Sequence, residues 1–218
     1  MTDFSQRRTT MVDTQVRPSD VTKFPIIEAM LTVPREIFVP TERREAAYAG
    51  EHIVLGQGRV VLDPRTLAKI LDVADIRPDE MVLDVGVGLG YSSALLARMA
   101  EAIVALEEDA DLASEAERAL SEANADNVAV IEGALTEGAA KHGPYDVILV
   151  QGAVQRMPQS LIDQLKDGGR IVAIFDEGAA HGAVRVGFKA DGAVTWRFAF
   201  NASAPVLPGF EAERAFAL

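Results

Sequence analysis

Three glycines at alternate positions, Gly86, Gly88 and Gly90, are the residues whose type and spacing point most clearly to a bound ligand. They follow the apolar segment Val82–Val85 and precede a helical pattern that begins at Tyr91. Because glycine has no Cβ, a loop of this kind brings backbone N–H groups close to a ligand at the start of a helix. The segment is therefore predicted to be a cofactor site.

Two acidic residues accompany this loop in the way expected for an adenosine-containing ligand. Glu107 is expected to end the next strand, where a carboxylate can accept hydrogen bonds from both ribose hydroxyls. Asp84 lies on the strand that bears the loop, and its negative charge suits a cationic ligand better than a pyrophosphate. Dinucleotide sites usually need G-x-G-x-x-G, whose third glycine falls on Tyr91 here. A nicotinamide enzyme is therefore the least favoured alternative.

A doubly wound, mostly parallel α/β sheet is expected to position these residues. From Met81 onwards, continuous apolar strands alternate with helical patterns, which is typical of a parallel sheet covered on both faces. The expected strands are Met81–Val85, Ala102–Leu106, Val128–Ile131, Val147–Val150 and Ile171–Phe175, with helices at Tyr91–Met99, Asp109–Glu122 and Pro158–Leu165. Two further runs, Val184–Phe188 and Val194–Phe200, predict a C-terminal antiparallel hairpin at the sheet edge.

The N-terminal part predicts a helical extension on this Rossmann-like fold. Residues 1–17 are polar and are expected either to be loosely ordered or to dock on the main body, with Gln15 and Arg17 as candidates for a lid. A first helix is expected after Asp20. Asp63 and Pro64 predict a helix start, as N-cap and first helical residue. Residues 1–75 are assigned to a cap and substrate-side segment and residues 76–218 to the cofactor-binding domain, packed as one unit.

The composition excludes several classes of partner. The 218 residues carry a formal net charge of −12, which disfavours a nucleic-acid substrate. There is no cysteine, and no run of about 18 apolar residues that would predict a membrane span. His52, His142 and His181 show no ligand spacing, so no metal site is predicted. A cytoplasmic protein is expected.

The chain resembles the protein-L-isoaspartate O-methyltransferase family, which belongs to the class I S-adenosylmethionine-dependent methyltransferases. The likeness rests on Val33-Pro34-Arg35-Glu36-Ile37-Phe38-Val39-Pro40 followed by Ala47-Tyr48, on Tyr145–Val150, and on Leu165–Arg170. The spacing G-x-G-x-G, with Asp84 before it, resembles motif I of those enzymes, whose ligand is a cationic sulfonium. The resemblance implies transfer of a methyl group from S-adenosylmethionine to the carboxylate of an isoaspartyl residue in damaged protein. It also adds Gly133, Ala134 and Gln151 to the cofactor site.

Two segments depart from the family pattern. Its active-site segment reads roughly T-I-S-x-P-H or T-I-S-x-P-Y, and alignment on the proline places Val60–Arg65 there, with Leu62, Asp63 and Arg65 as the catalytic positions. Leu62 replaces a serine hydroxyl. Arg65 could clamp a carboxylate or be a surface residue. After the third strand, Ala134 replaces an aspartate expected to bind adenine, so weaker cofactor binding is expected.

These departures leave two alternatives open beside isoaspartyl methylation. One is a methyltransferase of the same fold that acts on another carboxylate or small molecule, which Leu62 and Arg65 favour. The other is a catalytically weak descendant that binds a cofactor or a partner protein, which the loss of hydroxyls at positions 60 and 62 and of the acid at position 134 favours. A carboxylate with an ordinary pKa of about 4 is already anionic at neutral pH, so methyl transfer needs no general base.

Overall fold

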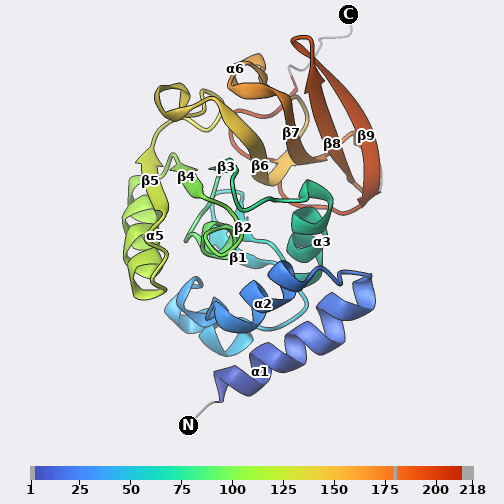
Figure 1. Ribbon diagram of the computed structural model, residues 1–218. Helices are drawn as coiled ribbons and strands as arrows, with labels where there is room; N and C mark the ends of the chain where they lie inside the picture. Colours follow the sequence, from blue (N-terminus) through green and yellow to red (C-terminus); the bar gives the residue numbers. More distant parts are fainter. Residues whose placement is uncertain (1–2, 179–180, 213–218) are drawn as a thin grey trace, which may run out of the picture.

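A seven-stranded sheet in the order β5-β4-β3-β6-β7-β8-β9 forms the centre of the molecule (Figure 1). The computed structural model describes residues 3–178 and 181–212. The strands of this sheet are β3 (Met81–Val85), β4 (Ala102–Glu107), β5 (Val128–Glu132), β6 (Tyr145–Val154), β7 (Leu165–Phe175), β8 (Ala183–Ala190) and β9 (Ala193–Asn201). The pairs among β3 to β7 are parallel, whereas β7–β8 and β8–β9 are antiparallel. The predicted α/β fold with its C-terminal hairpin is confirmed.

The central strands are apolar throughout because both faces of the sheet are buried. Along β3, Val82 packs in one hydrophobic cluster, and Leu83 and Val85 pack in the cluster on the other face. The first face is covered by α3 (Pro64–Ala74), α4 (Tyr91–Leu96) and α5 (Ala110–Glu122). The second is covered by α6 (Gln159–Asp163) and the segment that contains Leu207 and Phe210. This burial explains the continuous hydrophobic runs in the sequence.

Strands β6 and β7 are longer than predicted, and the helix between them is shorter. β6 and β7 already pair at Tyr145 and Leu165, with an irregularity before the next pair, Val147 and Arg170. The residues between Leu165 and Arg170 are polar or glycine and therefore give no apolar strand signal. The predicted helix Pro158–Leu165 consequently ends early, at Asp163.

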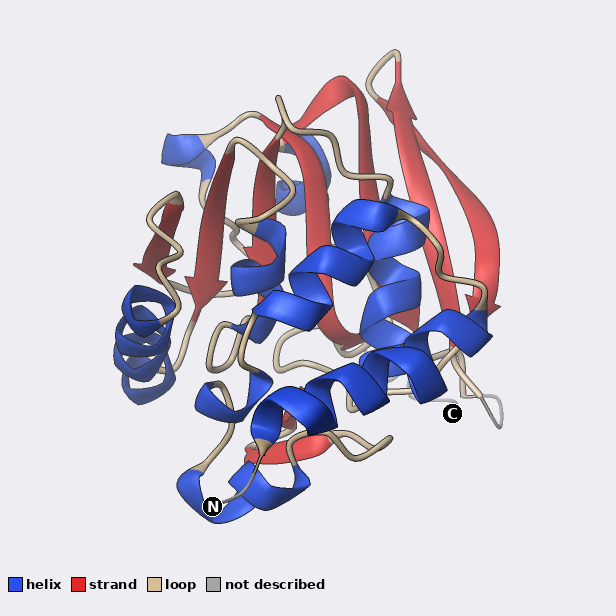
Figure 2. Ribbon diagram, turned by 60° about the horizontal axis from the view of Figure 1, so that its bottom comes forward, coloured by secondary structure: helices blue, strands red, loops and turns tan. Residues whose placement is uncertain are grey.

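Residues 4–19 are helical and docked on the main body, which confirms the second of the two predicted alternatives and excludes a loosely ordered tail. α1 (Phe4–Met11) continues into a π-helical turn and a 3-10 turn before α2 (Phe24–Thr32). Met11, Val12 and Val16 are fully buried and hold this arm against the main body. Figure 2 shows these helices lying together on one side of the molecule. The boundary near residue 75 stays a prediction, since side chains from both parts pack in one core cluster.

Arg35 explains the V-P-R segment physically. Its side chain is fully buried, its Nε donates to the Ala47 carbonyl at 2.6 Å, and its Nη2 donates to the Leu62 carbonyl at 2.8 Å. The guanidinium lies 4.6 Å from the centroid of the Tyr91 ring, directly after the glycine loop. Burial lowers the pKa of Arg35, against the attraction of Tyr91. One side chain thus links the N-terminal segment to the predicted site.

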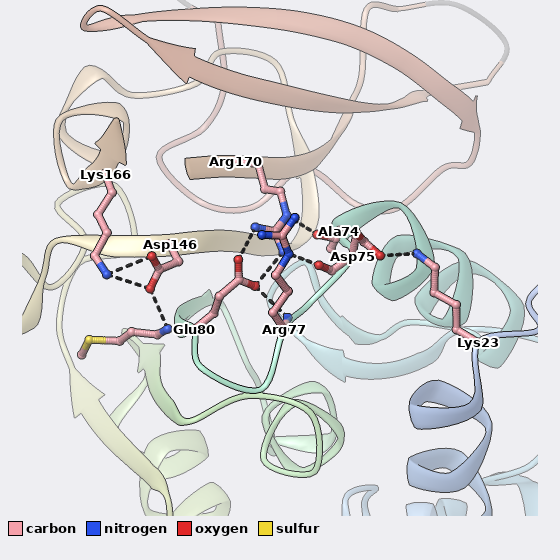
Figure 3. A network of polar contacts seen from close by, with 9 residues as sticks. Lys23, Ala74, Asp75, Arg77, Glu80, Asp146, Lys166 and Arg170 are labelled. Atoms are coloured by element: carbon pink, nitrogen blue, oxygen red, sulfur yellow. Dashed lines mark hydrogen bonds and ion pairs between the residues drawn. The ribbon is translucent and has the colours of Figure 1, made fainter. Parts of the chain in front are cut away.

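A second buried arginine ties the amino end of the parallel strands together (Figure 3). Both terminal nitrogens of Arg170 donate to the Glu80 carboxylate at 2.7 Å, immediately before β3. Its Nε binds the Ala74 carbonyl, and Nη2 also donates to the Asp75 carbonyl at 2.5 Å. Every nitrogen of this guanidinium therefore has a partner.

Among the described residues, no helix has both the length and the apolarity needed to cross a membrane.

Candidate cofactor and substrate site

The glycine loop lies at the carboxyl end of β3, beside the point where the strand order reverses between β3 and β6. Gly86, Gly88 and Gly90 have φ of +77°, +56° and +90°, the left-handed region that disfavours side chains. In open α/β sheets, ligands bind in the crevice at such a switch point. The backbone of the loop therefore has the predicted form and the predicted place.

Glu107 ends β4, as predicted, but its carboxylate is already fully engaged within the protein. Oε2 accepts the Gly88 N–H at 2.7 Å and a hydrogen bond from the Arg59 guanidinium. Oε1 accepts the N–H groups of Glu108 and Asp109 at 3.0 and 3.2 Å. Burial raises the pKa of Glu107, and the Arg59 charge and the backbone donors oppose that rise. The oxygens expected to bind ribose are thus bonded to the chain itself.

Asp84 belongs to a buried network rather than to a cavity wall. Its Oδ2 accepts hydrogen bonds from Ser92 and Ser93 at 2.6 and 2.7 Å, and its Oδ1 accepts one from Gln151 at 2.6 Å. The side chain is fully buried, and burial raises the pKa of this carboxyl. The network fixes the start of α4 to the strands beneath it. Asp84 and Gln151 thus stabilise the position of the loop through this buried network.

Two leucines lie directly against the glycines. A Cβ placed on Gly88 would lie 2.6 Å from Leu55 Cδ1, and one on Gly152, near the end of β6, would lie 2.6 Å from Leu207 Cδ2. A Cβ on Gly86 would meet Leu207 at 3.2 Å and Arg59 Nη2 at 3.3 Å. The backbone approach that the glycines permit is therefore used by side chains of this chain.

The segment that carries Leu207 extends the sheet above the loop. Val150 is the last residue of β6 that pairs with β3, and β6 continues for four residues beyond it. In this extension, Ala153 forms a parallel bridge with Val206. The Ala153 N–H donates to Pro205, and Leu207 donates back to Ala153, both at 2.9 Å. Leu207 is fully buried as a result. This segment takes the place that opens where β3 ends.

The space that remains beside Glu107 is small. It is a cavity of about 290 Å³ lined by Leu55, Gly56, Gln57, Arg59, Glu107, Glu108, Asp109, Asp111, Leu112 and Pro208. Ligand pockets usually span about 300–1,000 Å³. With Arg59 on Glu107 and Leu207 against the loop, the arrangement does not fit an adenosine cofactor in contact with all three glycines. The backbone of the loop suits such a ligand, whereas the side chains of Arg59 and Leu207 occupy the space that the ligand would need.

β1 (Ile53–Gly56) and β2 (Arg59–Val61) form the hairpin that supplies Leu55 and Arg59.

Gly133 and Ala134, which the sequence assigned to the cofactor site, follow β5. The Gly133 N–H donates to the Glu107 carbonyl at 2.9 Å, and Ala134 is exposed. Their contact with a cofactor stays a prediction.

A second cavity, of about 590 Å³, lies between the N-terminal arm, α3 and the end of β9. Its walls comprise Thr14, Gln15, Pro18, Ser19, Gly50, Asp63, Arg65, Thr66, Lys69, Phe200 and Asn201. Arg65 and Lys69 are one turn apart on α3 and face it together. Gln15 lines it as well, whereas Arg17 is not part of its wall, and a lid role for either residue stays a prediction.

The three predicted catalytic positions divide between core and cavity. Leu62 is 2% exposed, packs in the main hydrophobic cluster and contributes to neither cavity wall. Asp63 is the predicted N-cap, since it accepts the Thr66 N–H at 2.9 Å, and it also lines the larger cavity. Arg65 is exposed on that cavity. The position that lost its hydroxyl thus serves packing.

His52 has a structural role. Its Nδ1 accepts the Asp63 N–H at 2.9 Å, and its Nε2 lies 2.8 Å from the Ser203 carbonyl. It therefore connects β1, the start of α3 and the C-terminal segment. Within the residues that the structure describes, there is no group of three or more potential metal ligands.

Sequence reasoning missed Arg59, Leu55, Leu207 and Lys69. Arg59 directly precedes the segment aligned on the family motif, so a cation there was the available signal. Leu207 carried none, because its neighbour in space, Gly152, is far away in sequence.

The sequence model of the protein-L-isoaspartate(D-aspartate) O-methyltransferase family matches residues 6–200. The chain belongs to this family. A protein-L-isoaspartate O-methyltransferase of Koribacter versatilis is 38% identical over 172 residues, 79% of this chain and 78% of the relative. Another, of Syntrophus aciditrophicus, is 38% identical over 172 residues, 79% of each chain.

Solved structures of the isoaspartate methyltransferase family have the same fold. One protein-L-isoaspartate O-methyltransferase superimposes with a TM-score of 0.80 at 21% identity, covering 93% of this chain and 66% of the other. A Plasmodium falciparum homologue in complex with S-adenosyl-L-homocysteine gives 0.78 at 18% identity, covering 95% and 99%. At these identities the likeness concerns the fold.

Proposed function

We propose that this chain is an S-adenosylmethionine-dependent methyltransferase that esterifies the carboxylate of isoaspartyl residues in damaged proteins or peptides. Membership of the isoaspartate methyltransferase family carries the proposal. When bound, S-adenosylmethionine would supply the methyl group. Repair of aged protein in the cytoplasm is the physiological setting that we propose.

The larger cavity supports this proposal as the substrate side of the site. It lies beside the segment that the family uses for its active site, and its wall holds two cations, Arg65 and Lys69. Cations favour binding of an anionic carboxylate, and a guanidinium can hold both of its oxygens. Because the carboxylate is already ionised, the side chains need only orient it and exclude water. Asp63 and Arg65 are the residues we assign to this task.

For the cofactor side, we propose the backbone of Gly86, Gly88 and Gly90 with the Glu107 carboxylate as direct contacts. Asp84 and Gln151 support the loop through their buried network. Gly133 and Ala134 extend the site beyond β5. Use of these contacts requires that Arg59 and Leu207 leave the positions they hold in the structure.

A methyl-transfer assay with an isoaspartyl peptide tests this function, with the matching aspartyl peptide as control. We expect a methyl ester on the isoaspartyl peptide alone, detected by mass spectrometry. Arg65→Met is expected to raise KM for the peptide roughly tenfold with little change in kcat, because the lost contact is made equally in ground and transition states. Arg118→Met, an exposed change on α5, is the matched control. Transfer to both peptides alike, or to neither, contradicts the proposal.

A non-catalytic binding protein is the second candidate. Two features favour it: the buried Leu62 stands where the family has a serine hydroxyl, and Arg59 occupies the Glu107 carboxylate that a cofactor would use. Binding of S-adenosylhomocysteine without any methyl transfer would favour this candidate over the enzyme.

A further inference from the structure

The side chains of Arg59 and Leu207 occupy the space over the glycine loop from two different parts of the chain. Arg59 comes from β2 and is 4% exposed, while Leu207 comes from the C-terminal segment and is fully buried. Both would lie within 3.3 Å of a Cβ on Gly86. Their convergence on one glycine shows that the space above the loop is filled by the chain itself.

Arg59 is incompletely satisfied in this position. Its Nη2 binds Glu107, but its Nη1 is buried without a hydrogen-bond partner and makes only a long ion pair of 4.0 Å with Glu108 Oε1. An unpaired buried donor destabilises the state that contains it. Glu107, by contrast, keeps the N–H donors of Gly88, Glu108 and Asp109 when Arg59 leaves. The arginine is therefore the more easily displaced partner.

Leu207 is held by its backbone and fills space with its side chain. The Ala153 and Leu207 hydrogen bonds place the residue, so its side chain lies against Gly152 and Gly86. Truncating that side chain leaves the backbone pairing intact. The two residues can consequently be tested separately, one for charge and one for volume.

We infer that Arg59 and Leu207 determine the cofactor affinity of this chain by acting as internal competitors for the glycine-loop site. Arg59 competes for the Glu107 carboxylate, and Leu207 competes for the space against Gly86 and Gly152. A ligand with ribose hydroxyls can bind only as these two side chains move out. This inference rests on the proposed function for the identity of the ligand, an adenosine-containing thioether or sulfonium.

Calorimetric titration with S-adenosylhomocysteine tests the inference without relying on methyl transfer. We expect Arg59→Ala and Leu207→Ala each to lower Kd roughly tenfold relative to the unaltered chain, and the double variant to lower it further. Arg118→Ala is the control for loss of one positive charge, and Leu161→Ala is the control for truncation of a fully buried leucine elsewhere. Neither control is expected to increase affinity.

Unchanged or weaker binding by both test variants would overturn the inference, as would the absence of binding in every protein. Folding is checked by urea unfolding of each variant. Tighter binding by Arg59→Ala and Leu207→Ala, together with no transfer to an isoaspartyl peptide, would support the inference and contradict the proposed function. Transfer by the unaltered chain with no affinity gain in the variants would do the reverse.

Discussion

Two buried arginine–glutamate pairs lie at opposite ends of the parallel strands, and they differ in how completely the arginine is bonded. Arg170 at the amino end binds Glu80 through both terminal nitrogens and two backbone carbonyls through its remaining donors. Arg59 at the carboxyl end binds Glu107 through Nη2 and leaves Nη1 without a hydrogen bond, 4.0 Å from Glu108. The Arg170–Glu80 pair stabilises the fold, whereas the Arg59–Glu107 pair lies where a ligand is expected to bind.

The surroundings of the two pairs support this distinction. Further ion pairs flank the amino-end pair, from Lys23 to Asp75 at 2.7 Å and from Lys166 to Asp146 at 2.8 Å (Figure 3). A cavity adjoins the Arg59–Glu107 pair. A buried ion pair beside a cavity and a glycine loop is one that a ligand can replace.

The largest expected effect is that of Arg170→Met on stability. Removing this partner leaves Glu80 buried and two carbonyls without donors, so we expect a loss of about 3–5 kcal/mol in unfolding free energy, measured by urea denaturation. The double variant Glu80→Gln/Arg170→Met should lose less than the single one. A loss below about 1 kcal/mol in the single variant would break the comparison.

The same substitution at Arg59 is expected to cost far less. Arg59→Met removes one hydrogen bond to Glu107, which retains three backbone donors, and a long ion pair of 4.0 Å with Glu108. It also removes a buried nitrogen that has no hydrogen bond. We expect a loss of about 1–2 kcal/mol by the same measurement. Equal losses at Arg59 and Arg170 would show that both pairs serve the fold alike.

The pH dependence of stability is expected to differ in sign between the two ends. Burial raises the pKa of Asp84, so its contribution to unfolding free energy falls as pH rises from the ordinary value of 3.8 through the raised one. For Asp146 burial acts in the same direction, but the Lys166 and Met81 hydrogen bonds outweigh it and lower the pKa. Its contribution is therefore lost as pH falls below 3.8.

Urea unfolding over a series of pH values separates these contributions. Asp84→Asn should reduce the loss of stability on the alkaline side of pH 3.8, and Asp146→Asn should reduce the loss on the acid side. If both variants change the profile on the same side, the assigned signs are incorrect.

The sequence predicted those features that depend on local pattern. The glycine loop, the Asp63 cap and the position of Glu107 at a strand end each follow from residues within a few positions of one another. The family resemblance also rests on contiguous motifs, and the match to the family model confirms it.

The closure of the site could not be predicted, because it depends on contacts distant in sequence. Arg59 and Glu107 are 48 positions apart. Leu207 reaches Gly152 only because β6 outlasts β3 and offers a free edge. The sequence left open whether the N-terminal arm docks, because Met11, Val12 and Val16 stand in an otherwise polar segment.

A crystal structure of the Arg59→Ala variant with S-adenosylhomocysteine tests the central claim most directly. We predict that the ligand lies over Gly86 and Gly88, that its ribose is bonded to Glu107, and that the Leu207 side chain has moved away from Gly152. A ligand bound with Leu207 still against Gly152, or bound only in the cavity beside Arg65, would contradict the account.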